Sequence, residues 1–199
     1  MTTGSIIIAG VGGQGTLLAS KLLGGLLTGQ GYDVKVSEVH GMAQRGGSVV
    51  TYIRYGERVA SPIIDKGEAD ILVAFELLEA ARWAGHLKAR GGVLIANTQR
   101  ILPMPVITGA AAYPEGIAEK LGEICPGAVL VDALTPAEEA GSARAVNVVL
   151  MGVLSTVLGM PEEAWLAALE AQLKPSLWEM NRRAFRAGRA LGKGPQPPL

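Results

Sequence analysis

A glycine-rich turn behind an apolar segment is the feature that most constrains the fold of this chain. Four glycines fall within the six residues Gly10–Gly15, directly after the apolar run Ser5–Ala9. The residues that follow, Thr16–Leu27, carry leucines at the spacing of an amphipathic helix. At such a junction glycines permit positive φ angles and close backbone approach, and the free N–H groups of the helix attract an anion. The pattern predicts a strand, a tight turn and a helix N-terminus at which a phosphate group binds.

The same glycines also fit a nucleotide-binding motif. Gly10, Gly12 and Gly15 satisfy the G-x-G-x-x-G pattern of dinucleotide-binding domains, and their position behind a strand favours that interpretation. Glu38 lies 23 residues after Gly15, near the place where such domains carry the acid that binds a ribose hydroxyl. The alternative is a turn whose glycines only pack the helix against the strand.

The link between the second and third predicted strands argues against a standard dinucleotide-binding domain. Strands are expected at Val34–Val39, parallel to the first strand across the helical crossover, and at Ser48–Tyr55. Only the eight residues His40–Gly47 separate them, whereas a parallel crossover needs about a dozen residues or more. The third strand should therefore run antiparallel, which makes the sheet mixed.

The rest of the chain alternates short apolar runs with helical patterns. Further strands are predicted at Ala69–Phe75, Val93–Asn97 and Ala128–Asp132, and irregular extended segments at Val59–Ile64 and Val106–Thr108. Helices are predicted at Leu77–Arg90, Glu115–Glu123, Pro136–Ala140, Ala145–Leu158, Pro161–Leu173 and Ser176–Leu191. We therefore expect one three-layer, Rossmann-like α/β domain over residues 1–192, with a mixed, mainly parallel sheet and a helical C-terminal region. The proline-rich tail, residues 193–199, is expected to be disordered.

Composition favours a subunit of a larger assembly. The 18 Lys and Arg balance the 18 Asp and Glu, so no global field points to nucleic acid or to an anionic membrane. Charged residues make up only 18% of the chain and the mean hydropathy is +0.30, which means that apolar surface is in excess. Either the core is unusually large, or partner chains, which include a second copy of this one, cover part of that surface.

The single cysteine, Cys125, limits the redox chemistry open to this chain. One thiol cannot form an intrachain disulfide or a four-cysteine iron–sulfur or zinc site, so we expect no metal site here. Any cluster would belong to another chain. The N-terminus lacks the basic segment of a signal peptide, and the apolar run Val146–Met160 is too short to span a bilayer. A reducing cytoplasm is the predicted location.

A second glycine-rich segment is the most polar part of a chain that is otherwise poor in polar residues. Residues 36–49 read V-S-E-V-H-G-M-A-Q-R-G-G-S-V. Together with G-V-G-G-Q-G at 10–15, this segment strongly resembles the gamma subunit, or gamma domain, of the 2-oxoacid:ferredoxin oxidoreductases. Ser61–Ile64, Ala69–Glu76 and Ala145–Leu150 match as well, so the resemblance covers roughly residues 5–190. The phrase V-H-G-M is most similar to the small subunit of the indolepyruvate type.

The resemblance implies a role within a multi-subunit oxidoreductase. Members of this family decarboxylate a 2-oxoacid oxidatively, yield an acyl-coenzyme A and pass the electrons to ferredoxin. Thiamine diphosphate, Mg²⁺ and the iron–sulfur clusters are held mainly by the partner large subunit or subunits, and the absence of cluster cysteines here agrees. This chain would be the non-cluster subunit, inactive alone, which contributes a coenzyme A or phosphate-binding surface or covers the active site. No catalytic residue and no particular 2-oxoacid can be assigned from the sequence.

The resemblance also implies which residues meet a ligand. The glycine turn would contact a phosphate of coenzyme A or close a subunit contact, with Gln14 as a donor, and the second segment would line the face toward the active site. The full set is Gly10, Gly12, Gly13, Gln14, Gly15, Ser37, Glu38, His40, Gln44 and Arg45. Arg45 could hold a carboxylate or phosphate through its planar guanidinium, or anchor the loop. His40 could shuttle protons or be structural, and Glu38 could accept a hydrogen bond from a ligand or be a plain strand-end carboxylate.

Two further features, and the function as a whole, each have two possible interpretations. Asn147, polar within an apolar helix, could cap a buried carbonyl or touch a neighbouring chain. The arginines of the last helix could form a solvated face or meet an acidic partner subunit or ferredoxin; they are Arg182, Arg183, Arg186 and Arg189. The rival function is a free-standing Rossmann-like nucleotide-binding protein or an NAD(P)-dependent oxidoreductase. The eight-residue link and the apolar excess favour the subunit of a 2-oxoacid oxidoreductase.

Overall fold

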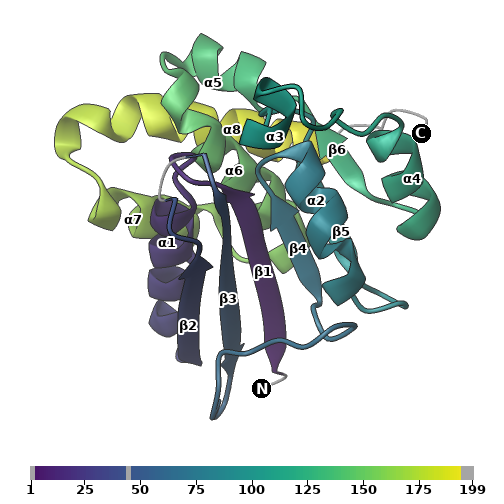
Figure 1. The fold of residues 1–199 in the computed structure, drawn as a ribbon. Coiled ribbons are helices and arrows are strands. Elements are labelled where there is room, and N and C mark those ends of the chain that lie inside the picture. Colours follow the sequence, from purple (N-terminus) through teal and green to yellow (C-terminus); the bar gives the residue numbers. More distant parts are fainter. Residues whose placement is uncertain (1–2, 44–45, 194–199) are drawn as a thin grey trace.

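The computed structural model describes residues 3–43 and 46–193, which form a mixed six-stranded sheet in the order β2-β3-β1-β4-β5-β6 (Figure 1). The strands are β1 (Gly4–Val11), β2 (Asp33–His40), β3 (Ser48–Gly56), β4 (Ile71–Ala74), β5 (Val93–Asn97) and β6 (Val129–Val131). β1, β4, β5 and β6 pair in parallel, and β3 runs antiparallel to both of its neighbours. The predicted mixed, mainly parallel sheet is confirmed.

Helices cover both faces of the sheet and give the predicted three layers (Figure 1). One face carries α1 (Thr16–Gly29), α6 (Val146–Leu158), α7 (Glu162–Gln172) and α8 (Trp178–Lys193), and the other carries α2 (Leu77–Trp83) and α4 (Ile117–Ile124). The shorter elements are α3 (Met104–Ile107), α5 (Leu134–Ala140) and three 3-10 turns, η1 (Ala84–His86), η2 (Ala143–Ala145) and η3 (Pro175–Leu177). The helical C-terminal region expected from the sequence is present.

The centre of the molecule is β1, whose two sets of alternating side chains belong to two separate hydrophobic clusters. Ile6 and Ile8 pack into the cluster under α1 and α6, whereas Ile7 and Ala9 pack into the cluster under α2 and α4. All four side chains are fully buried. A strand buried on both faces reads as a continuous apolar run, as Ser5–Ala9 does in the sequence.

The short link between β2 and β3 has the consequence that the sequence predicts. β3 pairs antiparallel with β2 and also with β1, from Gly4 opposite Tyr55 to Val11 opposite Ser48. β2 therefore runs parallel to β1, as predicted, and β3 lies between the two strands. As a consequence, β2 lies at the edge of the sheet, and most residues of its C-terminal half are exposed.

Several local predictions need correction. Val106 and Ile107, expected in a strand, belong to α3, and Thr108 is its C-cap, because the prolines at 103 and 105 fix φ values suited to a first helical turn. Residues 59–64 pair with no strand, and the helix expected over 77–90 stops at Trp83 and continues as the turn η1. α8 includes Lys193, one residue into the predicted tail, and the remaining tail residues lie outside the described part of the chain.

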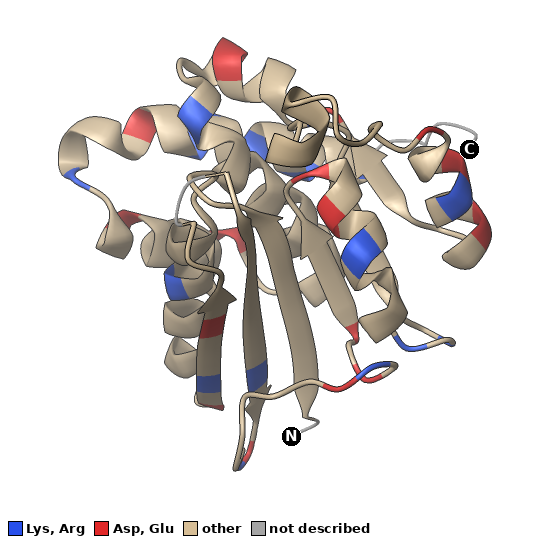
Figure 2. Cartoon of the chain, in the orientation of Figure 1, with Lys and Arg blue, Asp and Glu red and all other residues tan. Residues whose placement is uncertain are grey.

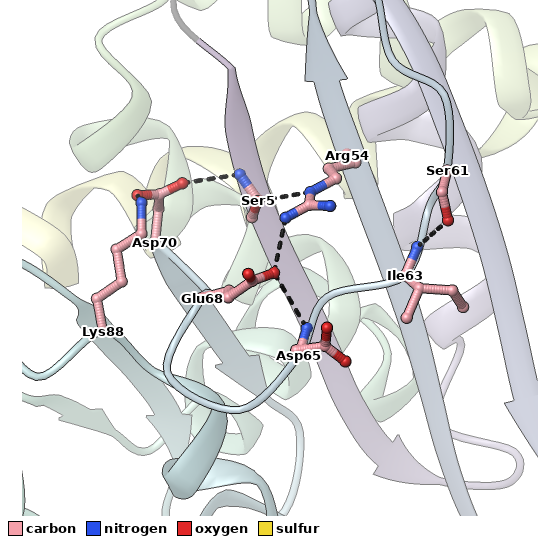
Figure 3. A network of polar contacts seen from close by, with 8 residues as sticks. All are labelled: Ser5, Arg54, Ser61, Ile63, Asp65, Glu68, Asp70 and Lys88. Atoms are coloured by element: carbon pink, nitrogen blue, oxygen red, sulfur yellow. Dashed lines mark hydrogen bonds and ion pairs between the residues drawn. The ribbon is translucent and has the colours of Figure 1, made fainter.

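A network of polar contacts closes the amino end of the parallel strands (Figure 3). The Asp70 carboxylate accepts from the N–H of Ser5 at 2.8 Å and pairs with Lys88 at 2.5 Å. Arg54 of β3 pairs with Glu68 at 2.8 Å, and Glu68 also accepts from the N–H of Asp65 at 3.3 Å. Arg54 and Lys88 are thus paired with Glu68 and Asp70, and the network holds the 57–68 connection against the sheet.

The arginines of α8 are also engaged within the chain. Arg182 pairs with Glu170 at 2.5 Å and Arg186 with Glu162 at 2.9 Å, both on α7. Arg183 donates to a backbone carbonyl of α5, and Arg189 to the Ser155 hydroxyl and toward α7. Figure 2 shows acidic and basic residues interspersed over the molecule, with neither sign gathered on the side in view. The arginines of α8 therefore bind this helix to α5, α6 and α7. Neither a solvated face nor a surface for an acidic partner describes these contacts fully.

Candidate functional site

The glycine loop between β1 and α1 sits where the connections of two neighbouring parallel strands diverge. From β1 the chain passes to α1 on one face of the sheet, and from β4 it passes to α2 on the other. Open α/β sheets bind ligands in the crevice that such a divergence creates at the carboxyl ends of the strands. The predicted strand, turn and helix are confirmed, and they place the loop at this crevice (Figure 1).

The side chain of Gln14 fixes the shape of the glycine loop from inside. Its Oε1 accepts from the N–H of Val11 at 2.7 Å, and its Nε2 donates to the Phe75 carbonyl at 2.9 Å. The Nε2 also approaches Gln99 Oε1 at 3.5 Å. The oxygen of the amide therefore holds the loop to the end of β1, and the nitrogen joins the loop to the residue that follows β4. These contacts favour a structural role for Gln14 over the expected role of phosphate donor.

Gly15 begins α1 in a conformation and at a distance that only glycine suits. Its φ is 85°, in the left-handed region, and a Cβ there would lie 2.5 Å from Asn147 Nδ2. Asn147, at the start of α6 and only 4% exposed, donates to the Gly15 carbonyl at 3.3 Å and accepts from the N–H of Val148 at 2.9 Å. Of its two sequence-based interpretations, capping of a buried carbonyl is confirmed.

The two glycine-rich segments lie side by side. The N–H of Gly12 donates to the Gly47 carbonyl at 2.8 Å, and the N–H of Gly46 donates to the Gly12 carbonyl at 3.2 Å. Gln44 and Arg45, predicted to be ligand or interface residues, lie outside the described residues. Gly46 and Gly47 of the second segment are thus bonded directly to the glycine loop.

A cleft of about 610 Å³ opens on one side of the glycine loop. We call it the Arg144 cleft; its lining is Gly13, Gln14, Gly15, Gln99, Ile101, Leu134, Ala143, Arg144 and Val146. Arg144, from the turn η2 before α6, is exposed, and its guanidinium has no acidic partner among residues 3–43 and 46–193. No carboxylate lines this cleft. Its electrostatic character therefore favours an anion.

A second hollow, of about 380 Å³, lies on the other side of the loop. We call it the His40 groove; its lining is Gly12, Gly13, Gly15, Thr16, Leu17, Glu38, His40 and Val49. Glu38 accepts a long hydrogen bond from Thr51 at 3.4 Å, and His40 contacts the carbonyl of Gly41 at 2.9 Å through Nδ1. Both residues are exposed. The groove carries a carboxylate, which disfavours a phosphate.

Ser37 does not share the face of Glu38 and His40. Successive residues of a strand point to opposite faces, and Ser37 lies opposite Tyr52, whereas Glu38 lies opposite Thr51. Tyr52 in turn packs against Trp83 beside α2, on the other face of the sheet. Ser37 therefore points away from the side of the sheet that carries Glu38 and His40, and its predicted contact with a ligand stays a prediction.

Buried carboxylates lie under the second glycine segment, in a third hollow of about 400 Å³. Glu79 accepts from the Ser48 hydroxyl at 2.5 Å, and burial raises the pKa of its carboxyl above the ordinary value. Glu76 accepts from Tyr113 at 2.7 Å and from the N–H of Ile101 at 3.1 Å. Burial and the Glu76 contact together raise the pKa of Tyr113. These groups hold the base of the site in place.

The sequence missed Gln99 and Arg144, which both line the Arg144 cleft. Gln99 follows β5 and Arg144 precedes α6, so neither belongs to a glycine motif, and only the sheet order brings them to the loop. A polar residue just after a predicted parallel strand was the one available signal for Gln99. In residues 3–43 and 46–193 no cluster of His, Cys, Asp and Glu has the geometry of a metal site. Within the same ranges, none of the helices is both long and apolar enough to cross a membrane.

The fold and the site define a Rossmann-like α/β protein with an antiparallel strand inserted in its sheet and an anion-favouring cleft at the carboxyl ends of its parallel strands. The family model described as pyruvate ferredoxin/flavodoxin oxidoreductase matches residues 5–191. The chain is 41% identical over 189 residues to indolepyruvate oxidoreductase subunit IorB of Thermococcus kodakarensis, across 92% of this chain and 93% of that protein. This chain belongs to the pyruvate ferredoxin/flavodoxin oxidoreductase family.

Solved structures show the same fold. Pyruvate oxidoreductase subunit PORC of Thermotoga maritima superposes with a TM-score of 0.72 at 21% identity, over 96% of this chain and 97% of that one. The 2-oxoglutarate:ferredoxin oxidoreductase of Magnetococcus marinus, with 2-oxoglutarate, coenzyme A and succinyl-CoA bound, gives 0.74 at 19% identity, over 97% of this chain and 31% of that one. The fold thus occurs both as a separate subunit and within a longer chain. The rival function, a free-standing nucleotide-binding protein or NAD(P)-dependent enzyme, finds no support in these relatives.

Proposed function

We propose that this chain is the small, non-cluster subunit of an indolepyruvate-type 2-oxoacid:ferredoxin oxidoreductase, and that its Arg144 cleft holds a phosphate of coenzyme A. The complex would convert indolepyruvate, or another aryl or branched 2-oxoacid, to an acyl-CoA and reduce ferredoxin. The 41% identity to IorB supports this substrate class. The observation that carries the coenzyme A part is the Arg144 guanidinium, which has no acidic partner in the described chain and faces a cleft without a carboxylate.

The cleft suits a phosphate in size and in chemistry. About 610 Å³ lies within the range of small-molecule sites. No described residue accepts a hydrogen bond from the N–H of Gly13, and no side chain caps the N-terminus of α1. The first N–H groups of a helix have no partner within the helix, and the helix dipole adds a partial positive charge there. Arg144 adds a full charge and a planar set of donors.

In this proposal the chain binds and orients one end of the coenzyme, while its partner performs the redox chemistry. Thiamine diphosphate, Mg²⁺ and the iron–sulfur clusters would be held by the large subunit, since Cys125 is the only thiol of this chain. Coenzyme A supplies the thiol that takes up the acyl group. Glu38 and His40, beside the loop but outside the Arg144 cleft, would face the partner together with Gln44 and Arg45. Residues 1–192 would act as one gamma-type domain, because every described strand belongs to one sheet.

The surface that the large subunit would cover is an apolar rim beside the second glycine segment. It consists of Met42, Leu102, Met104 and Ile107, each at least 49% exposed. Three of these residues lie in or next to α3, at the same end of the sheet as the glycine loop (Figure 1). Exposed apolar side chains of this kind mark an interaction site, and a partner bound to them would cover the crevice.

Reconstitution tests this proposal. The chain and its candidate large subunit are purified separately and together, and viologen reduction is assayed with coenzyme A and a set of 2-oxoacids. We expect no activity from the chain alone, and a complex that prefers aryl 2-oxoacids. Activity of the isolated chain with NAD(P), or failure of the two chains to associate, would overturn the proposal.

A matched pair of variants tests the apolar rim. Ile107 and Ile124 are 62% and 67% exposed, but Ile124 lies on α4, away from α3. Ile107→Asp should weaken association with the large subunit at least tenfold, and Ile124→Asp should leave it unchanged. Equal effects of the two substitutions would remove the rim from the interface.

A further inference from the structure

Three side-chain amides meet beneath the glycine loop, and their hydrogen bonds determine one another's orientation. They belong to Gln14 on the loop, Asn97 at the end of β5 and Gln99 two residues later. Carboxamide oxygen and nitrogen are distinguished by their partners. Backbone N–H donors and carbonyl acceptors fix the orientation of two of the three amides. These two amides in turn fix the orientation of the third.

Gln14 is oriented by one backbone donor and one backbone acceptor. The N–H of Val11 can only donate, so the atom that faces it at 2.7 Å is Gln14 Oε1. The Phe75 carbonyl can only accept, so the atom that faces it at 2.9 Å is Nε2. Gln14 therefore presents its NH₂ group toward the carboxyl ends of β4 and β5.

Asn97 is oriented in the same way, from the opposite side. Its Oδ1 accepts from the N–H of Ala133 at 3.1 Å, and its Nδ2 donates to the same Phe75 carbonyl at 3.2 Å. Asn97 is fully buried. Both amides thus turn an NH₂ group toward Gln99, at 3.5 Å from Gln14 and 3.4 Å from Asn97.

An atom that receives two N–H donors must be an acceptor, so Gln99 turns its Oε1 inward. Its NH₂ group then points away from the amide cluster, and no described residue accepts a hydrogen bond from it. Gln99 is half-buried and lines the Arg144 cleft. If the amide of Gln99 were rotated by 180°, its NH₂ group would face the NH₂ groups of Gln14 and Asn97, and no hydrogen bond could form between them. The orientations of Gln14 and Asn97 therefore oppose that rotation.

We infer that Gln99 is a ligand-contacting residue of the Arg144 cleft, which donates from Nε2 to a phosphate oxygen of the bound coenzyme. The inference rests on the proposed function, because it assumes that the cleft holds a phosphate. Gln14 and Asn97 act as positioning residues, since they fix the polarity of Gln99 and do not reach the ligand themselves. In this site Arg144 supplies a positive charge, and Gln99 supplies a hydrogen bond that requires an acceptor at a defined position. Their pairing discriminates a tetrahedral anion from an apolar group of similar size.

Two substitutions at position 99 separate the donor from the rest of the side chain. Gln99→Glu keeps an inward acceptor for Gln14 and Asn97 but replaces the donor by a charged acceptor, and Gln99→Met removes the donor without adding charge. In the assembled complex, the KM for coenzyme A should rise about fivefold to twentyfold for Gln99→Met, and more for Gln99→Glu, with kcat within twofold of the parent. Adenosine 3′,5′-bisphosphate, used as a competitive inhibitor, should lose affinity in parallel.

Arg144→Ala separates the proposed phosphate site in the cleft from the proposed role of Gln99 in it. If neither Arg144→Ala nor the position-99 variants change the KM for coenzyme A, the cleft does not hold the coenzyme and the proposed function of the cleft fails. If Arg144→Ala raises the KM while Gln99→Met leaves it unchanged, only the role of Gln99 is overturned, even where Gln99→Glu has an effect through its charge. Melting temperatures of the variants show whether the loop remains folded, and Gln99→Glu, which keeps both inward hydrogen bonds, covers a failure of Gln99→Met to fold.

Discussion

The two hollows beside the glycine loop share Gly13 and Gly15 but differ in where their other residues come from. The His40 groove is built from residues close to the loop in sequence or on the neighbouring strands, and it contains a carboxylate. The Arg144 cleft is built from segments more than eighty residues further along the chain, and it contains an arginine and no carboxylate. The comparison teaches that the richest motif in the sequence marks the edge of the site, while the groups best suited to an anion lie elsewhere.

The largest effect is expected from a substitution that distorts the loop shared by both hollows. Gly15→Ala places a side chain at φ 85° and within 2.5 Å of Asn147 Nδ2. The left-handed conformation alone costs about 1–2 kcal/mol, and the clash adds to it. We expect a melting temperature lower by several degrees and a KM for coenzyme A raised more than tenfold in the complex.

Gly13→Ala is the matched control, since Gly13 also has a positive φ, 104°, but has nothing within 4 Å of the added Cβ. It should cost only the conformational strain. Asn147→Ala in the Gly15→Ala background should recover part of the stability. If Gly13→Ala and Gly15→Ala are equally destabilising, the contact with α6 is not what holds the loop.

The next largest effect separates the two hollows directly. Arg144→Ala removes the one cation that the described residues contribute to its cleft, and a hydrogen bond to a charged group is worth about 1.5–3 kcal/mol. The KM for coenzyme A should therefore rise about tenfold to a hundredfold, with Arg144→Lys intermediate because a lysine keeps the charge but loses the planar fork. His40→Ala should leave this KM unchanged. The reverse ranking would move the phosphate to the His40 groove.

The sequence predicted the fold better than the site, for a physical reason. Strand and helix patterns are local, and the length of the 40–47 link is enough to demand an antiparallel β3. The position of β3 between β1 and β2 is set by tertiary packing, which no local pattern contains. For the same reason the glycines of the loop were found, while Gln99 and Arg144, brought there by β5 and η2, were not.

Alternation along an edge strand separates Ser37 from the other predicted site residues of β2. Ser37, Glu38 and His40 are close in sequence, and the resemblance suggested one shared surface. A period of two sends Ser37 toward Tyr52 and the other two toward the His40 groove. Ser37→Ala should accordingly have no effect on the KM for coenzyme A.

The smallest expected effect concerns the anchor of the second glycine segment. Glu79 is buried and accepts from the hydroxyl of Ser48, near the end of that segment, at 2.5 Å. Burial raises the pKa of its carboxyl in the folded protein, so between the ordinary pKa and the raised one the folded state binds more protons than the unfolded state. The contribution of Glu79 to stability is therefore complete below the ordinary pKa and is lost as the pH rises through the raised one.

Glu79→Gln tests this anchor, because the amide oxygen still accepts from Ser48 but cannot ionise. The free energy of unfolding, measured by urea titration from pH 4 to pH 8, should fall less steeply with pH in the variant than in the parent, because the group that binds more protons in the folded state has been removed. Glu163→Gln, at an exposed position of α7, is the control and should leave the slope unchanged. A variant as steep as the parent would mean that Glu79 ionises freely. The second segment would then be held by its backbone bonds to Gly12 alone, and both sides of the glycine loop would depend on the same few contacts.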